Sequence, residues 1–142
     1  MVTVGRSDFA HYDTVLRGIE EADDLELRLM PTAAHFSEHY GRTIREIGIQ
    51  GYAYEVGLET LLDTDSPQGT GKSIGLGVIS FTQSFAQDQP DLLVVLGDRM
   101  EMICAPLAAI PFNIPVVHLY GGKVSEGAID ELVRHALTKM AH

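Results

Sequence analysis

The amino-acid sequence predicts an α/β fold in which a parallel sheet carries helices on both faces. Strand-like and helix-like patterns alternate along the chain, the connections between them are short, and the run Leu92–Leu96 is continuously apolar. A run of that kind is typical of a strand covered on both faces, and such alternation is typical of parallel strands joined by helices. The length of 142 residues fits one domain with a real core.

The first half of the chain supplies three of the expected strands. Val2–Val4 is a short run containing two valines and a threonine, which favours a strand. Apolar residues at helical spacing follow over Tyr12–Ile19, and Leu25–Leu29 alternates with period two, which indicates a helix and a second strand. A further helix is expected over Ser37–Ile47, and Tyr52–Val56 is a weak third strand.

The second half contains the clearer elements. After a polar loop, a helix is expected over Gly71–Gln87, followed by the strand Leu92–Leu96. A helix over Glu101–Ile110 contains Pro106 as a bend or an early-turn residue, and Pro115–Leu119 is the fifth strand. The last helix is expected to begin near Gly127 and to carry one apolar stripe.

The connections favour the strand order 3-2-1-4-5, which opens a crevice between the first and fourth strands. Ligands of such sheets bind at the carboxyl ends of the strands. Polar residues follow the strands at this edge or open the last helix. They are Arg6, Ser7, Asp8, Thr32, His35, Asp98, Arg99, His118, Tyr120, Lys123, Asp130, Glu131 and Arg134.

Several of these candidates also have a purely structural interpretation. Asp98 is equally suited to cap the following helix, because aspartate accepts hydrogen bonds from free helix N–H groups. Asp130 and Arg134 have the spacing of a pair on one helix face. His35 and His118 stand at strand ends, where histidines are often satisfied members of the core. These alternatives stay open at the level of sequence.

Composition excludes several classes of function. Lys and Arg number 10 against 20 Asp and Glu, and the formal net charge of -10 argues against a nucleic-acid binder. Cys104 is the only cysteine, and the histidines show no metal-ligand spacing, so neither a disulfide framework nor a metal site is expected. We expect a cytoplasmic protein, because a lone thiol inside an apolar stretch suggests a reducing compartment and the N-terminus lacks the basic-then-apolar pattern of a signal peptide. We expect no membrane span, because no apolar run is long enough.

Two glycine motifs resemble nucleotide-binding loops and fail. Gly69–Ser73 ends like a phosphate-binding loop, but that motif needs glycine where Ser66 stands. Gly75 and Gly77 begin a dinucleotide fingerprint, but Ser80 replaces its third glycine and the segment lies inside an expected helix. A flavodoxin-like domain is also disfavoured, because the loop after the first strand is not rich in Ser, Thr and Gly.

Four segments of the chain resemble the motifs of one known family. Residues 90–101, PDLLVVLGDRME, are similar to its "PDLVLVLGDRxE", and residues 113–122 are similar to "NIPxxHxxGGE". Residues 126–139 resemble "EGAIDExIRHAxTK", and residues 3–9 fit a "GTRxDY" start. These motifs are those of the UDP-N-acetylglucosamine 2-epimerase family, especially its hydrolysing branch, and the resemblance spans essentially the whole chain in order.

The resemblance implies a fold, a reaction and a setting. The fold is the N-terminal Rossmann-like half, residues 1–142, of a two-domain glycosyltransferase-B-type enzyme whose C-terminal domain is absent. The reaction is anti elimination of UDP from a UDP-sugar, followed by addition of water to release a 2-epimeric N-acetyl sugar, without a metal or redox cofactor. The setting is sialic or nonulosonic acid biosynthesis in a homo-oligomer, dimer or tetramer, and we expect the 142-residue chain alone to be inactive.

The resemblance also implies residue roles. Asp98 and Asp130 match catalytic carboxylates, with Glu131 as a further catalytic candidate and His118 orienting groups on the sugar side. Arg6 and Arg99 match positions that contact the nucleotide, and arginine suits phosphate because its planar fork donates paired hydrogen bonds. The remaining substrate-binding candidates are Ser7, Asp8, His35, Tyr120 and Arg134.

Two positions depart from the family pattern. Tyr120 stands where several members have a third catalytic carboxylate, and Lys123 stands where the pattern expects glutamate. The substrate is therefore open between UDP-N-acetylglucosamine and a UDP-diacetamido-bacillosamine. A non-catalytic sugar-nucleotide-binding module is the alternative from a different functional class.

Overall fold

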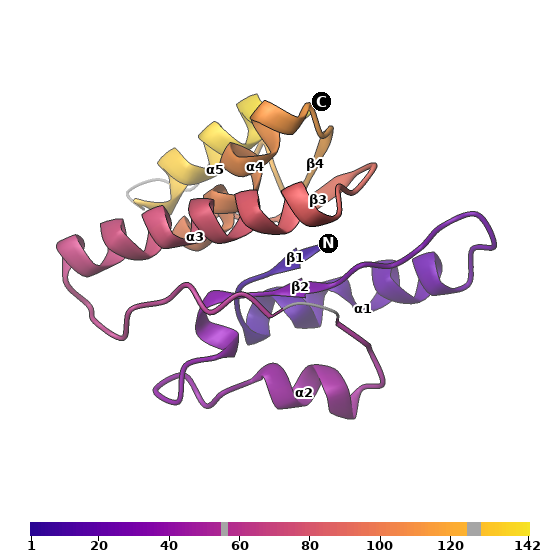
Figure 1. The fold of residues 1–142 in the computed structure, drawn as a ribbon, viewed down its shortest axis with the longest axis horizontal. Coiled ribbons are helices and arrows are strands. Elements are labelled where there is room, and N and C mark those ends of the chain that lie inside the picture. The colour runs from indigo at the N-terminus through magenta and orange to yellow at the C-terminus, as the bar shows by residue number, and fades with distance from the viewer. Residues whose placement is uncertain (55–56, 125–128) are drawn as a thin grey trace.

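The computed structural model describes residues 1–54, 57–124 and 129–142, and these residues form three layers (Figure 1). Parallel strands make the middle layer. On one face lie α1 (Arg6–Glu20) and α2 (Ile44–Ile49), and on the other lie α3 (Pro67–Gln87), α4 (Cys104–Ala109) and α5 (Asp130–Met140). The predicted α/β class with helices on both faces is confirmed.

The strands form two parallel pairs. β1 (Val2–Thr3) pairs with β2 (Met30–Pro31), and β3 (Leu93–Leu96) pairs with β4 (Val116–Leu119). β1 lies beside β3, although within the described ranges no ladder joins these two strands. The expected neighbours therefore lie next to each other, and the crevice between the first and fourth expected strands lies between β1 and β3.

Two strand predictions are displaced. The second strand was expected at Leu25–Leu29, but β2 begins at Met30, because β1 is only two residues long and its partners are Met30 and Pro31. The third was expected at Tyr52–Val56, of which residues 55–56 lie outside the described residues. What pairs instead is a single parallel bridge between Thr32 and Leu58.

Two helix predictions in the flanking layers change at their first residues. The helix expected over Ser37–Ile47 is limited to α2, because Gly41 and Arg42 adopt positive φ and interrupt the helical path before Ile44. α3 begins at Pro67 rather than Gly71. The Ser66 hydroxyl accepts a hydrogen bond from the backbone N–H of Gly69 at 3.1 Å, and proline is well suited to the first helical position.

The helix expected over Glu101–Ile110 is divided into three short pieces. A 3₁₀ turn over Met100–Ile103 leads into α4, and a second 3₁₀ turn, Ile110–Phe112, follows it. Pro106 lies in the first turn of α4, where its missing N–H costs no helical hydrogen bond. Of the two alternatives expected for Pro106, a bend or an early-turn residue, the second is confirmed. The expected start of the last helix near Gly127 lies outside the described residues, and α5 is described from Asp130.

The core has one apolar cluster on each face of the strands. Leu93 and Val95 point to the face covered by α3, α4 and α5, while Val94 and Leu96 point to the face covered by α1 and α2. This alternation follows from the period-two geometry of a strand. It explains why the run Leu92–Leu96 has no polar face, and it leaves the carboxyl ends of the strands as the place for polar groups.

Gly77 allows α3 and α4 to pack closely. A Cβ atom at Gly77 would lie 2.6 Å from the Sγ atom of Cys104, whereas nothing lies within 4 Å of a Cβ at Gly75. Cys104 is buried, and burial raises the pKa of its thiol to about 12. Gly77 therefore serves helix packing, whereas Gly75 does not. No helix of the described residues is long and apolar enough to cross a membrane.

Candidate functional site

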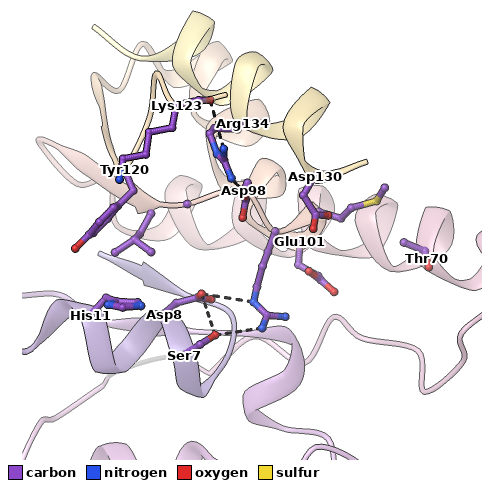
Figure 2. A pocket seen from close by; sticks show the side chains of 14 residues that line it. Ser7, Asp8, His11, Thr70, Asp98, Glu101, Tyr120, Lys123, Asp130 and Arg134 are labelled. Atoms are coloured by element: carbon purple, nitrogen blue, oxygen red, sulfur yellow. Dashed lines mark hydrogen bonds and ion pairs between the residues drawn. The ribbon is translucent and has the colours of Figure 1, made fainter. Parts of the chain in front are cut away.

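A cavity of about 610 Å³ opens at the carboxyl ends of β1 and β3, where the strand order placed the crevice (Figure 2). Its walls come from the start of α1, the segment after β3, the segment after β4 and the start of α5, with one residue from α3. Seven of the predicted site residues line it. They are Ser7, Asp8, Asp98, Arg99, Tyr120, Asp130 and Arg134, and Lys123 from the list of polar candidates lines it as well.

Asp98 is held by Arg134. Directly after β3, Gly97 takes a positive φ of 77°, and the Asp98 carboxylate that follows forms an ion pair with the Arg134 guanidinium from α5. A second guanidinium nitrogen of Arg134 donates to the backbone carbonyl of Lys123 at 3.3 Å. The 3₁₀ turn at Met100 has no side-chain cap, so Asp98 is an ion-pair partner rather than a helix cap.

Arg99 reaches across the crevice to α1. Its Nη2 donates to the Ser7 hydroxyl at 3.1 Å, and its Nε lies 3.5 Å from Oδ1 of Asp8. The Asp8 side chain is only 9% exposed, and burial raises the pKa of its carboxyl while Arg99 opposes that shift. Figure 2 marks the contacts of Ser7 and Asp8 with dashed lines.

His118 lies behind the cavity wall and connects three backbone segments. Its Nε2 donates to the carbonyl of Gly97 at 2.7 Å, and its Nδ1 is hydrogen-bonded to the Thr138 hydroxyl at 3.1 Å. The hydroxyl oxygen of Thr138 in turn accepts from the N–H of Gly122 at 3.3 Å. A Cβ at Gly121 would lie 2.6 Å from His118 Nδ1, which explains the glycine there. His118 therefore braces the residue before Asp98.

Tyr120 and Lys123 form the wall that follows β4. Tyr120 adopts a positive φ of 59°, which is uncommon for a bulky side chain, and its ring lies 5.7 Å from the His11 ring of α1. The Lys123 ammonium lies 5.5 Å from the centre of the Tyr120 ring. Backbone strain of this kind occurs preferentially at functional sites. The two departures from the family pattern thus lie together on the same cavity.

Three predicted site residues lie off the cavity, in addition to His118. Arg6 points outward, with 74% of its side chain exposed, and its Nε lies 3.2 Å from Glu46 of α2. Glu131 pairs with His135 at 3.2 Å along α5. Neither position supports the expected contact with substrate or nucleotide.

His35 is the third, and it is fully buried. Both ring nitrogens are hydrogen-bonded at 2.9 Å, Nε2 to Thr3 and Nδ1 to Thr43. Burial, with a smaller effect from Arg99, lowers the pKa of His35 to about 4. Its expected contact with substrate finds no support in this position, and the alternative interpretation as a satisfied core histidine describes it.

Three polar residues line the cavity without having been predicted: His11, Thr70 and Glu101. His11 lies one helical turn from Ser7 and Asp8 on α1, so helical spacing could have identified it. Glu101 lies inside the 90–101 segment that carries the resemblance. Thr70 belongs to the glycine-rich motif that the sequence excluded as a phosphate loop. Among the described residues, no group of His, Cys, Asp and Glu is arranged to hold a metal ion.

Comparison with known proteins defines the class. The family model described as UDP-N-acetylglucosamine 2-epimerase matches residues 17–142, and the chain belongs to this family. The chain is 38% identical to a UDP-N,N'-diacetylbacillosamine 2-epimerase (hydrolyzing) of Legionella pneumophila over 99% of its length. It is 33% identical to a GDP/UDP-N,N'-diacetylbacillosamine 2-epimerase (hydrolyzing) of Campylobacter jejuni and 32% identical to a UDP-N-acetylglucosamine 2-epimerase of Neisseria meningitidis. The Campylobacter jejuni match covers 100% of this chain, and the Neisseria meningitidis match covers 99% of it.

Solved structures of the same class share the fold. The structure of the Neisseria meningitidis UDP-GlcNAc 2-epimerase bound to UDP-GlcNAc matches 99% of this chain with a TM-score of 0.82 at 17% identity. That of the Methanocaldococcus jannaschii enzyme in complex with UDP-GlcNAc and UDP matches 99% with a TM-score of 0.83 at 20% identity. This confirms the Rossmann-like, glycosyltransferase-B-type fold class. The chain spans 36–37% of the curated relatives and 37% of these two structures.

Proposed function

We propose that this chain is part of a hydrolysing UDP-N-acetylglucosamine 2-epimerase. The enzyme would eliminate UDP from a UDP-2-acetamido sugar and add water to release the 2-epimeric sugar, such as N-acetylmannosamine. One observation carries the proposal: the cavity at the β1–β3 crevice combines two carboxylates, Asp98 and Asp130, with the guanidinium of Arg99. Family membership supports the same reaction class.

The chemistry needs a base, an acid and an anion-binding group. A base removes the proton on C2, the C–H electron pair forms a C1=C2 double bond, and the C1–O bond to UDP breaks. Water then adds its oxygen to C1, and C2 receives a proton on the opposite face. Because the C2 proton is weakly acidic, a precisely placed carboxylate is required. We assign Asp98 and Asp130 to the acid and base roles, and Arg99 to the diphosphate.

The other cavity residues support these roles. Arg134 orients Asp98 through the ion pair, and Ser7 and Asp8 hold Arg99. Tyr120 and Lys123 occupy the wall where the departing diphosphate or the sugar would lie. We assign His118 a positioning role through Gly97. Arg6 would have to leave Glu46 before it could reach a nucleotide.

A second substrate is favoured by a specific observation. The 38% and 33% identical relatives are both named as N,N'-diacetylbacillosamine 2-epimerases. UDP-diacetylbacillosamine carries the same acetamido group at C2 and the same leaving group as UDP-N-acetylglucosamine. The elimination chemistry is therefore unchanged, and the two substrates differ at the far side of the sugar, away from the reacting carbons.

We further propose that residues 1–142 form the N-terminal half of the enzyme and supply one wall of the substrate cleft. Coverage of only 36–37% of the relatives supports this organisation. On this basis the 142-residue chain alone has no turnover. We also propose a homo-oligomeric enzyme, a dimer or a tetramer, that acts in the cytoplasm in sialic or nonulosonic acid biosynthesis.

The decisive experiment incubates the full-length gene product with each UDP-sugar separately. Release of UDP together with a free 2-epimeric sugar, observed by NMR, supports the enzyme, and the ratio of kcat/KM values identifies the substrate. In D₂O the product should carry deuterium at C2. Binding of both UDP-sugars without turnover would instead favour the non-catalytic binding module.

A further inference from the structure

Asp8 and Arg99 form a contact that has no catalytic role in the reaction described above. The Asp8 side chain is more than nine-tenths buried, yet it lines the cavity. Its Oδ1 lies 3.5 Å from Arg99 Nε and 3.4 Å from the Ser7 hydroxyl. Its Oδ2 is buried without a hydrogen-bond partner of good geometry. A buried carboxylate therefore depends mainly on one guanidinium.

Apart from Arg99, the surroundings of Asp8 do little to stabilise its buried negative charge. The nearby charged groups are Arg99 and Glu101, both from the segment after β3, and Glu101 repels the carboxylate. On α1 itself the buried hydroxyl of Tyr12 has no hydrogen-bond partner of good geometry, and burial, with a smaller contribution from the Asp8 charge, raises its pKa. The backbone N–H of Val4 gives only weak support. The other titratable groups around the same cavity are His11, Asp98, Lys123, Asp130 and Arg134.

Arg99 is also the group that the proposed function assigns to the diphosphate. A guanidinium binds carboxylate and phosphate with the same planar donor fork, so the two anions compete for it. Half of the Arg99 side chain is exposed to the cavity region, so a ligand can reach it without unfolding the wall. A phosphate on Arg99 would draw the cation away from Asp8 and bring a second negative charge close to it.

We propose that Asp8 holds the Arg99 guanidinium in the place of a ligand phosphate, and that an entering diphosphate displaces this carboxylate and makes it take up a proton from solvent. The inference rests on the proposed function for its ligand class. It adds a positioning residue, Asp8, and a linkage between nucleotide binding and protonation. The direction of the pH dependence follows from the displaced charge. Losing its contact with Arg99 raises the pKa of Asp8 further, so UDP binding strengthens as the pH falls toward the pKa of this carboxyl.

Calorimetric titration of the full-length gene product with UDP tests the exchange. Titrations at a series of pH values below neutrality, in two buffers of different ionisation enthalpy, measure the protons taken up on binding, because burial raises the pKa of the Asp8 carboxyl above its ordinary value. The wild type should take up more protons per UDP than Asp8→Asn, up to one more. At about pH 7.5 Asp8→Asn should bind UDP roughly two- to fivefold more tightly, the equivalent of a partly exposed ion pair. UDP itself titrates equally in both, so the difference reports on Asp8.

Asp13→Asn is the matched control, because Asp13 lies on the same helix, has a half-exposed side chain and pairs with Arg17 at 3.1 Å outside the cavity. It should behave as the wild type. Should Asp8→Asn fail to fold, Arg99→Gln carries the test: it should bind UDP at least about tenfold more weakly and lose the additional proton.

Equal proton uptake by the wild type and Asp8→Asn, or weaker UDP binding by Asp8→Asn, would overturn the exchange while leaving the proposed function intact if UDP-sugar is still turned over. Turnover without measurable UDP binding would overturn it as well. The absence of both UDP binding and turnover would overturn the exchange and the proposed function together.

Discussion

The Arg134 guanidinium on α5 forms an ion pair with the Asp98 carboxylate after β3, although 36 residues separate them in the sequence. Arg134 also donates to the Lys123 carbonyl. One side chain therefore joins the segments after β3 and β4, the two walls that carry Asp98, Tyr120 and Lys123. The helix that ends the chain thus orients the carboxylate to which the proposed reaction assigns proton transfer.

Asp98→Asn should remove turnover while leaving the fold and UDP binding nearly unchanged. The amide keeps the size of the side chain but cannot accept the C2 proton, so kcat should fall by at least about 100-fold. Incorporation of deuterium at C2 in D₂O should disappear with it. Asp91→Asn, an exposed substitution before β3, is the control and should retain both. Persistent exchange in Asp98→Asn would show that Asp98 is not the proton-transfer group.

His118→Phe should lower kcat more than it changes KM. The substitution removes the hydrogen bonds to Gly97 and Thr138 that brace the residue before Asp98, and a small displacement of a catalytic group lowers the rate by about 10- to 100-fold. Thr138→Val removes the links of Thr138 to His118 and to the Gly122 N–H but keeps the hydrogen bond from His118 to Gly97, so it should have a smaller effect in the same direction. Unfolding in urea should show a loss of about 1–2 kcal/mol for His118→Phe. An unchanged kcat would assign His118 to stability alone.

His35 should make the protein less stable in weak acid. Its pKa is lowered to about 4 in the folded state, below the ordinary value of 6.5, so the unfolded chain binds a proton first as the pH falls. The stabilising contribution is complete above about pH 6.5 and is lost on the way to about pH 4, amounting to about 2–3 kcal/mol.

The measurement is the free energy of unfolding in urea at several pH values for the wild type and His35→Gln. The slope between pH 6.5 and 4 should be shallower in His35→Gln, whereas the exposed His39→Gln should keep the wild-type slope. Equal slopes in all three would mean that the buried ring takes up a proton at its ordinary pKa.

Gly77→Ala and Gly75→Ala should change stability in opposite directions. A methyl group at Gly77 meets Cys104 Sγ at 2.6 Å and Cβ at 2.9 Å, so overpacking should cost about 1–3 kcal/mol. At Gly75 nothing lies within 4 Å, and alanine should stabilise α3 by about 0.5–1 kcal/mol. Thermal unfolding separates the two. A Gly77→Ala, Cys104→Ala double variant should recover part of the loss, and a neutral Gly77→Ala would show that α4 can move.

The sequence alone determined the layered α/β class and the edge at which the cavity opens. Continuous apolar runs such as Leu92–Leu96 require cover on both faces, and parallel strands place their carboxyl ends at one edge, so Asp98, Arg99 and Tyr120 had to gather there. Short elements were less predictable, because β1 and β2 have only two residues each and their register depends on partners far along the chain.

Only the tertiary structure decided which polar residues face the cavity and which form partners elsewhere. His35 follows β2 in the sequence and Asp8 follows β1. Yet His35 is hydrogen-bonded between two threonines, whereas Asp8 lies against Arg99. Arg6 and Arg99 are equally basic, but one pairs with Glu46 outside the cavity and the other spans it. The physical reason is that side-chain pairing depends on which elements meet in space, and local patterns carry no information about contacts 30 to 90 residues away.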